Sequence, residues 1–132
     1  MQLNPNTQII PELPYTWREA LTQGSTGVMA QPTEEQINNV IQLANLLIPI
    51  IELIGSCSIN SWLRTPEHNA QVGGAGHSAH LLGAAVDLHP LHETVENCKA
   101  LISNMIDRKL FFERNTTTWL HLDFKHNHDF LA

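Results

Sequence analysis

The stretch S-A-H-L-L-G-A-A-V-D, from Ser78 to Asp87, decides the architecture of this chain together with W-L-H-L-D, from Trp119 to Asp123. The first stretch supplies His80 and Asp87, and the second supplies His121. Two neutral imidazoles and one carboxylate form a ligand set that catalytic zinc accepts, with a further position kept for water. The sequence therefore predicts one metal site, assembled from two distant parts of the chain.

Alternation along two expected strands supports this grouping. Successive side chains of a strand point to opposite faces, so His121 and Asp123 share one face of the last strand and apolar residues fill the other. In the earlier strand, expected over residues 84–88, Asp87 also alternates with apolar residues. If the two strands are neighbours, Asp87 and His121 converge on one side. His80, on a short turn or helical piece before the strand, then completes the set.

Other segments carry signals for helices that would cover this sheet. Thr16 with Glu19, and Thr33 with Gln36, have the spacing of capping boxes at helix starts. Pro49 lies inside the second of these helices, where it is expected to kink the helix or tighten its last turns. Helices are expected after Thr16 and over residues 33–54, 66–72 and 94–108, with further strands over 56–60, 110–114 and 119–124.

Length and composition indicate one folded domain. The chain has 132 residues, of which 42% are hydrophobic and only 15% charged, which argues against disorder. We expect a single α+β domain over residues 1–132, with 1–14 as an extended lead-in and 125–132 as a tail. Its small, mostly antiparallel sheet would carry the metal site and be packed by helices.

Charge and hydropathy exclude several classes of partner. The formal net charge of −6 argues against nucleic acid, which selects for basic surfaces. No run of about eighteen apolar residues predicts a membrane span. The start, M-Q-L-N-P-N-T-Q, has neither a basic segment nor an apolar core, so no secretory signal is expected. We therefore expect synthesis in a cytoplasm, with any action outside it following release by other means.

The cysteines and remaining histidines give weaker signals. Cys57 and Cys98 lie in apolar settings, are interpreted as small buried residues, and do not predict a disulfide framework. His126 and His128 are interpreted as part of a solvated tail. His77 could face the metal site, line a cleft or point to water.

The motif S-x-H-x-x-G-x-A-x-D resembles the signature of zinc D-Ala-D-Ala carboxypeptidases and related L-Ala-D-Glu endopeptidases of bacteria and phages. These enzymes share the hedgehog/D,D-peptidase fold. The segment R-T-P-E-H-N-A-Q-V-G-G, residues 64–74, is similar to a second family segment, and W-L-H-L-D is similar to the closing metal-ligand strand. The resemblance covers nearly the whole chain. It implies that His80, Asp87 and His121 bind one Zn²⁺ per chain.

The resemblance also implies roles for two polar residues near the metal site. Arg64 matches an arginine that family members place near the carboxylate of the substrate, a role suited to its planar, bidentate guanidinium. A structural salt bridge is the alternative for Arg64. Ser78 is expected to form hydrogen bonds in the site, by positioning the loop or by contacting substrate.

The chain departs from the family pattern at two places. Many relatives carry an acidic residue or a histidine just before the last ligand, where this chain has Thr118 and Trp119. The general base is therefore expected to be Glu113, in L-F-F-E, with Asp123 as the alternative and neither as a third possibility. The usual Ser-Gly-Tyr-Arg segment is S-W-L-R here, residues 61–64, which is expected to reshape one wall of the cleft.

The expected function is hydrolysis of a peptide bond in peptidoglycan stem peptides, with zinc as cofactor. The enzyme would be a D,D-carboxypeptidase or an L-Ala-D-Glu endopeptidase similar to phage endolysins, and the sequence does not choose between them. A non-catalytic zinc-binding module and a structural domain of a virion are the alternatives. We expect a monomer that acts on the cell wall after release or from a virion, with no nucleic acid partner.

Overall fold

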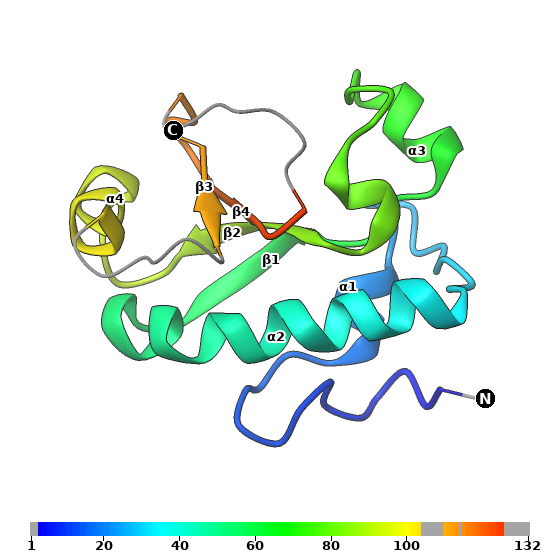
Figure 1. Cartoon of the computed structure of the whole chain (residues 1–132), viewed down its shortest axis with the longest axis horizontal. Helices are drawn as coiled ribbons and strands as arrows, with labels where there is room; N and C mark the ends of the chain where they lie inside the picture. Colours follow the sequence, from blue (N-terminus) through cyan, green and yellow to red (C-terminus); the bar gives the residue numbers. More distant parts are fainter. Residues whose placement is uncertain (1–2, 104–109, 114, 126–132) are drawn as a thin grey trace.

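A four-stranded sheet forms the centre of the molecule. The computed structural model describes residues 3–103, 110–113 and 115–125. Within these ranges the strands are antiparallel and lie in the order β1-β2-β4-β3 (Figure 1). The expected small antiparallel sheet is therefore confirmed. The strands are β1 Cys57–Ser61, β2 Ala85–Pro90, β3 Phe111–Phe112 and β4 Leu120–Asp123.

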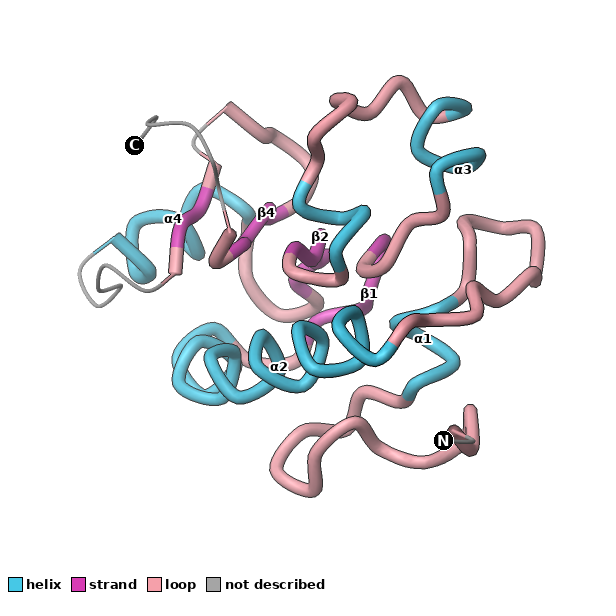
Figure 2. Tube along the Cα trace, turned by 45° about the vertical axis from the view of Figure 1, so that its right-hand side comes forward, coloured by secondary structure: helices cyan, strands magenta, loops and turns pink. Residues whose placement is uncertain are grey.

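Helices surround this sheet in the described part of the chain. The long helix α2 runs beside the sheet, α3 and α4 lie toward opposite ends of the molecule, and the N-terminal segment follows the outer side of α2 (Figures 1 and 2). A short 3-10 helix, η1, leads directly into β2. The helices are α1 Trp17–Leu21, α2 Glu34–Ile54, α3 Pro66–Gln71, η1 Ala79–Leu82 and α4 Val95–Ser103.

Local sequence signals explain where two of these helices begin. The backbone N–H of Thr16 donates to Oε1 of Glu19 at 2.8 Å, and the N–H of Glu19 donates back to Oγ1 of Thr16 at 3.3 Å. The same reciprocal pairing joins Thr33 and Gln36 at the start of α2. Both predicted capping boxes are therefore confirmed. α2 continues through Pro49 and ends at Gly55.

The hydrophobic core lies on the face of the sheet that does not carry the candidate ligands. Every second residue of β2 and β4 points away from the candidate ligands, and these residues form one cluster with the buried side of α2. By length and composition alone α2 could also cross a membrane, but in this fold 44% of its most apolar window is buried inside the domain. The residues that β2 and β4 contribute to this cluster are Val86, Leu88, Leu120 and Leu122.

Several smaller predictions can also be compared with the structure. Cys57 and Cys98 are both free thiols buried in the core, as expected. Trp62 and Leu63 are buried as well, so the departure from the family pattern at these two positions places apolar side chains in the core. The expectation that it reshapes one wall of the cleft stays a prediction. The end of the helix predicted over residues 94–108, Arg114, His126 and His128 fall outside the described residues.

Candidate metal centre

Two side chains of α2 fix the position of η1, which carries His80. Nε2 of Gln36 and Nδ2 of Asn39 each donate to a carbonyl of the last two η1 residues, both at 2.9 Å. At the other end of η1, Oγ of Ser78 accepts from the backbone N–H of His80 at 3.2 Å. These bonds satisfy groups that a helix end would otherwise leave unpaired. Ser78 therefore positions the segment of His80, one of its two expected roles.

Gly83 allows the chain to turn from η1 into β2. It has a left-handed conformation with φ of +75°, which L-residues with a Cβ adopt only at a cost. A Cβ at Gly83 would also lie 3.0 Å from both the Gln36 carbonyl oxygen and Cγ2 of Val40. The indole N–H of the fully buried Trp62 donates to the Gly83 carbonyl at 3.2 Å. The turn between η1 and β2 is therefore enclosed by α2 on one side and by Trp62 on the other.

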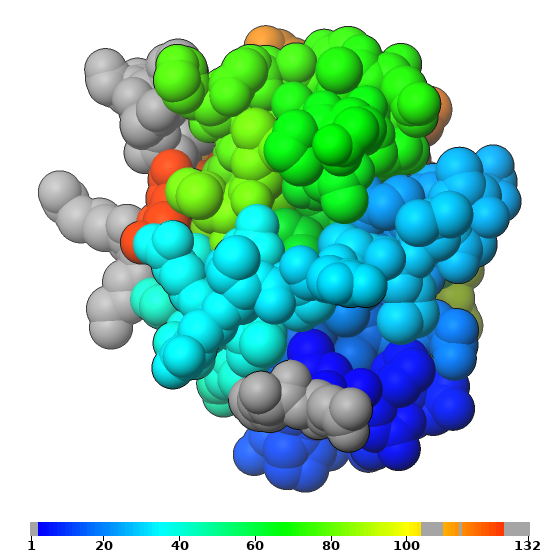
Figure 3. Space-filling model, turned by 90° about the vertical axis from the view of Figure 1, so that its right-hand side faces the viewer, coloured from blue at the N-terminus to red at the C-terminus, as the bar shows by residue number. Residues whose placement is uncertain are grey.

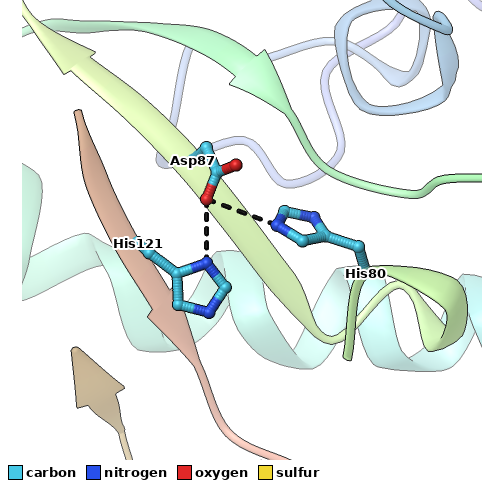
Figure 4. A group of neighbouring side chains, drawn as sticks. All are labelled: His80, Asp87 and His121. Carbon is cyan, nitrogen blue, oxygen red and sulfur yellow. Dashed lines mark hydrogen bonds and ion pairs between the residues drawn. The ribbon is translucent and has the colours of Figure 1, made fainter. Parts of the chain in front are cut away.

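The pairing of β2 with β4 brings the other two candidate ligands together. Asp87 lies directly opposite His121 in the antiparallel register, so their side chains share one face of the sheet. Nδ1 of His121 is 2.8 Å from Oδ1 of Asp87, and Nε2 of His80 is 3.3 Å from the same oxygen (Figure 4). The three ligand atoms all lie within 4.8 Å of one another. The expected convergence of these residues is confirmed.

Hydrogen bonds select the ring nitrogen that each histidine turns toward the site. Nδ1 of His80 lies 2.7 Å from the Trp62 carbonyl, which can only accept, so Nδ1 carries the proton in the neutral ring. Nε2 of His80 then carries a lone pair that faces a carboxylate oxygen of Asp87. Among the described residues this buried nitrogen has no hydrogen-bond partner. A cation between Nε2 and Asp87 would turn that repulsion into attraction. The donor set therefore fits a divalent metal ion.

His121 is held through Nε2, whereas His80 is held through Nδ1. Its Nε2 lies 2.9 Å from Oδ2 of Asp123, which leaves Nδ1 toward Asp87. Asp123 is fully buried, so it lies behind the ring and away from solvent. A carboxylate in this position orients a ligating histidine and raises its basicity. His80 and His121 would accordingly present Nε2 and Nδ1 to a shared ion.

Charges in the site perturb two pKa values strongly. Burial tends to raise the pKa of Asp87, but the hydrogen bond with His121 and the proximity of both histidines outweigh it and hold this pKa well below its usual range. Burial lowers the pKa of His121, yet hydrogen bonds with Asp123 and Asp87 raise it to about 9. Without a metal ion, His121 is therefore a cation between two carboxylates at neutral pH. A bound divalent ion would replace its proton.

Arg64 forms three hydrogen bonds beside these residues. It donates from Nε to Oγ of Ser61 at 3.1 Å, from Nη1 to Oδ1 of Asn69 at 3.2 Å, and from Nη2 to Oδ2 of Asp87 at 3.3 Å. Burial lowers the pKa of Arg64, while Asp87 acts in the opposite direction. The structural salt bridge considered for Arg64 is therefore present, and it joins a candidate metal ligand.

The two carboxylates considered as general base occupy different positions. The backbone N–H of Glu113 donates to the His121 carbonyl at 3.0 Å, which continues the register of Phe112 opposite Leu122 by one residue. Glu113 therefore falls on the same sheet face as His121 and is only partly buried. Asp123, in contrast, is fully buried and hydrogen-bonded to His121. This geometry gives Asp123 an orienting role that the sequence had not suggested.

Comparison with known families identifies the chain. A family model described as Peptidase M15 matches residues 12–123. The chain belongs to the Peptidase M15 family. The match spans every candidate site residue, from Arg64 to Asp123. M15 peptidases are zinc-dependent, and the cluster of His80, Asp87 and His121 could hold such an ion. No functionally curated protein matches this M15 chain.

Proposed function

We propose that this M15 protein is a zinc peptidase that hydrolyses a peptide bond in the stem peptides of peptidoglycan. The observation that carries the proposal is the convergence of three ligand atoms within 4.8 Å on one face of the sheet. A four-stranded antiparallel sheet with η1 leading into β2 also supports assignment to the hedgehog/D,D-peptidase fold. A crystal structure whose strand order differs from β1-β2-β4-β3 would reject that fold assignment.

In this proposal His80, Asp87 and His121 hold the zinc ion. Zinc, when bound, polarises a carbonyl oxygen and makes water a better nucleophile at neutral pH. The chain's own contribution is a fixed geometry: η1 presents His80, while adjacent positions of β2 and β4 present Asp87 and His121. The buried lone pair on Nε2 of His80 supports a ligand role in particular.

Glu113 is proposed as the general base. Its place opposite His121 and its partial exposure would let its carboxylate take a proton from water and pass it to the leaving amine. The residue that contests this role is Asp123, whose burial against His121 removes it from water. Changing Glu113→Gln keeps the size of the side chain and removes its basicity. Unchanged hydrolysis by Glu113→Gln would reject Glu113 as base.

Arg64 and Ser78 are proposed to bind substrate as well as to support the site. After its contacts with Ser61, Asn69 and Asp87, the guanidinium still has N–H groups that could meet a substrate carboxylate. Arg64→Lys keeps the positive charge but loses the fork, so it should raise KM for carboxylate-bearing substrates. An unchanged KM would limit Arg64 to its contact with Asp87.

Mass analysis of muropeptides tests the function directly. The purified protein is incubated with peptidoglycan, with and without a chelator and with zinc restored after chelation. Loss of a terminal D-alanine would indicate a D,D-carboxypeptidase, whereas cleavage between L-Ala and D-Glu would indicate an endopeptidase. Zinc binding without new products would instead support a non-catalytic module, and a protein with neither property would support a structural domain.

A further inference from the structure

Asn69 lies between two segments of the candidate metal centre. It is only 5% exposed, which is unusual for an asparagine. Its Oδ1 accepts a hydrogen bond from Nη1 of Arg64 at 3.2 Å, and its Nδ2 donates to the Ala75 carbonyl at 2.9 Å. A guanidinium can only donate and a carbonyl can only accept, so these partners fix the orientation of the amide.

Each contact of this amide leads to one candidate zinc ligand. On one side, Nη2 of Arg64 donates to Oδ2 of Asp87 at 3.3 Å, which leaves Oδ1 toward the histidines. On the other side, the Ala75 carbonyl also accepts from the backbone N–H of Ser78 at 3.1 Å. Oγ of Ser78 in turn accepts from the N–H of His80 at 3.2 Å. One buried amide therefore links the segments that carry Asp87 and His80.

The chain leaving α3 passes directly over this amide. Gly73 is left-handed, with φ of +72°, and its N–H donates to the Ala70 carbonyl at 3.2 Å, while the N–H of Gly74 donates to the Asn69 carbonyl at 2.8 Å. These two bonds form a Schellman motif. Figure 3 shows α3 and the segment that follows it, in green, on the surface above α2. The motif therefore sets where the loop over Asn69 begins.

Gly74 lies so close to Asn69 that a residue with a Cβ would not fit in its place. A Cβ added at Gly74 would overlap Oδ1 of Asn69, and it would lie 2.7 Å from Cγ of Asn69 and 3.0 Å from Nη1 of Arg64. A side chain at this position would displace the amide from Arg64. The φ of Gly74 is not positive, so the close approach, and not the backbone conformation, requires glycine.

We propose that Asn69 is a positioning residue for the zinc site, and that Gly74 is needed because it lets the loop after α3 close over the Asn69 amide. This inference rests on the proposed function, since it takes His80, Asp87 and His121 as the zinc ligands. Asn69 itself contacts neither metal nor substrate and acts through Arg64 and the Ala75 carbonyl. Its loss should therefore weaken zinc binding more than it weakens folding.

A comparison of Gly74→Ala with Gly76→Ala tests the steric part of the proposal. Gly76 lies in the same loop, its φ is not positive, and a Cβ there would meet nothing within 4 Å. Zinc affinity of the full chain is measured by competition with a chromophoric chelator, alongside far-UV circular dichroism. Gly74→Ala should weaken zinc binding about 10–100-fold, the range typical for partners of metal ligands. Gly76→Ala should bind zinc as the wild type does.

Two changes at Asn69 separate its contacts. Asn69→Ala removes both and should weaken zinc binding by about tenfold or more. Asn69→Asp keeps an acceptor for Arg64 but loses the donor to the Ala75 carbonyl, so it should retain more zinc affinity than Asn69→Ala. Limited proteolysis within residues 73–77 should nevertheless become faster in Asn69→Asp. This partial rescue distinguishes positioning of Arg64 from a general packing role.

Each outcome of these measurements decides the proposal. Folded Gly74→Ala and Asn69→Ala proteins with wild-type zinc affinity would overturn it, even if peptidoglycan hydrolysis is observed. If Gly74→Ala does not fold, the two Asn69 variants decide alone. The expected affinity differences without hydrolysis by the wild type would support the positioning role and reject the peptidase. A wild-type protein that binds no zinc would overturn both.

Discussion

The two candidate histidine ligands are held in contrasting surroundings. The side chain of His80 is 2% exposed, and its second ring nitrogen contacts the neutral carbonyl of Trp62. The side chain of His121 is 16% exposed, and its second nitrogen contacts the carboxylate of Asp123. One ligand is therefore fixed by burial and backbone, and the other by charge.

This difference divides the site into a structural side around His80 and an electrostatic side around His121. A carbonyl partner fixes the tautomer of an imidazole, whereas a carboxylate partner also raises its basicity. Changes around His80 should therefore alter stability and metal binding together. Changes around His121 should alter metal binding and its dependence on pH. The predictions below test this division, starting with the largest expected effect.

Removing either histidine should abolish stoichiometric zinc, but the two losses should affect folding differently. His80→Ala leaves the buried Trp62 carbonyl without its partner and should cost about 1–3 kcal/mol. His121→Ala leaves Asp87 and Asp123 without their shared cation. Because His121 helps to lower the pKa of Asp87, the loss of stability in His121→Ala should be largest at neutral pH and should shrink in acid, as Asp87 becomes protonated. Elemental analysis and urea unfolding at several pH values measure both effects.

His77→Ala is the matched control, because His77 is exposed three residues from His80. It should keep one zinc per chain and wild-type stability. Zinc retained by either His80→Ala or His121→Ala would remove that residue from the ligand set. Parallel pH profiles for these two variants would contradict the division between their surroundings.

Gly83→Ala should destabilise the structural side. Gly83 and Gly27 both have positive φ, at +75° and +78°, but only at Gly83 would a Cβ meet neighbouring atoms. The conformation itself costs a residue with a Cβ about 1–2 kcal/mol, and crowding against Gln36 and Val40 should add about 1–3 kcal/mol. Thermal unfolding of both variants isolates the crowding. Equal losses would show that α2 can yield at this contact.

Asp123→Asn should weaken the electrostatic side alone. The amide keeps a hydrogen bond to Nε2 of His121 but has no charge, so zinc affinity should fall about tenfold. Circular dichroism should remain that of the wild type. The comparison is with Trp62→Phe, which loses the indole hydrogen bond to the Gly83 carbonyl. This variant keeps the backbone carbonyl of residue 62, which is the partner of His80. Trp62→Phe should lower stability with little change in zinc affinity, and the reverse pattern would contradict the division.

The last prediction concerns the pH dependence of the metal-free protein. The pKa of His121 is raised to about 9, above the value of about 6.5 in an unfolded chain. Its contribution to stability is therefore complete below pH 6.5 and is lost as pH rises through about 9, by about 1.4 kcal/mol per pH unit at most. Calorimetry without zinc should show this decline. With zinc, stability should instead rise over the same range, because protons then compete with the metal.

The clustering of the three candidate ligands could be predicted because its determinants are local or periodic. The motif around His80 and Asp87 is contiguous, and alternation along β2 and β4 required only that these strands be neighbours. Capping boxes are likewise complete within a few residues, which is why the starts of α1 and α2 were predicted well. Such signals need no knowledge of the tertiary structure.

The supporting contacts could not be predicted, because they join residues that meet only after folding. These contacts are hydrogen bonds to segments distant in sequence or to a loop. They are made by the Trp62 carbonyl, the side chains of Gln36 and Asn39, and the amide of Asn69. None of them is recognisable by residue type alone. The general expectation that each ligating histidine has a partner on its other nitrogen would have suggested that Asp123 is such a partner.

The two buried thiols offer a practical consequence. Burial raises the pKa of Cys57 to about 12, and the pKa of Cys98 is also raised by burial, so neither is a reactive thiolate in the folded domain. Alkylating reagents should therefore modify them only in molecules that open. The protein thus carries an intrinsic reporter of its own conformational opening, readable by mass spectrometry without a label near the candidate metal centre.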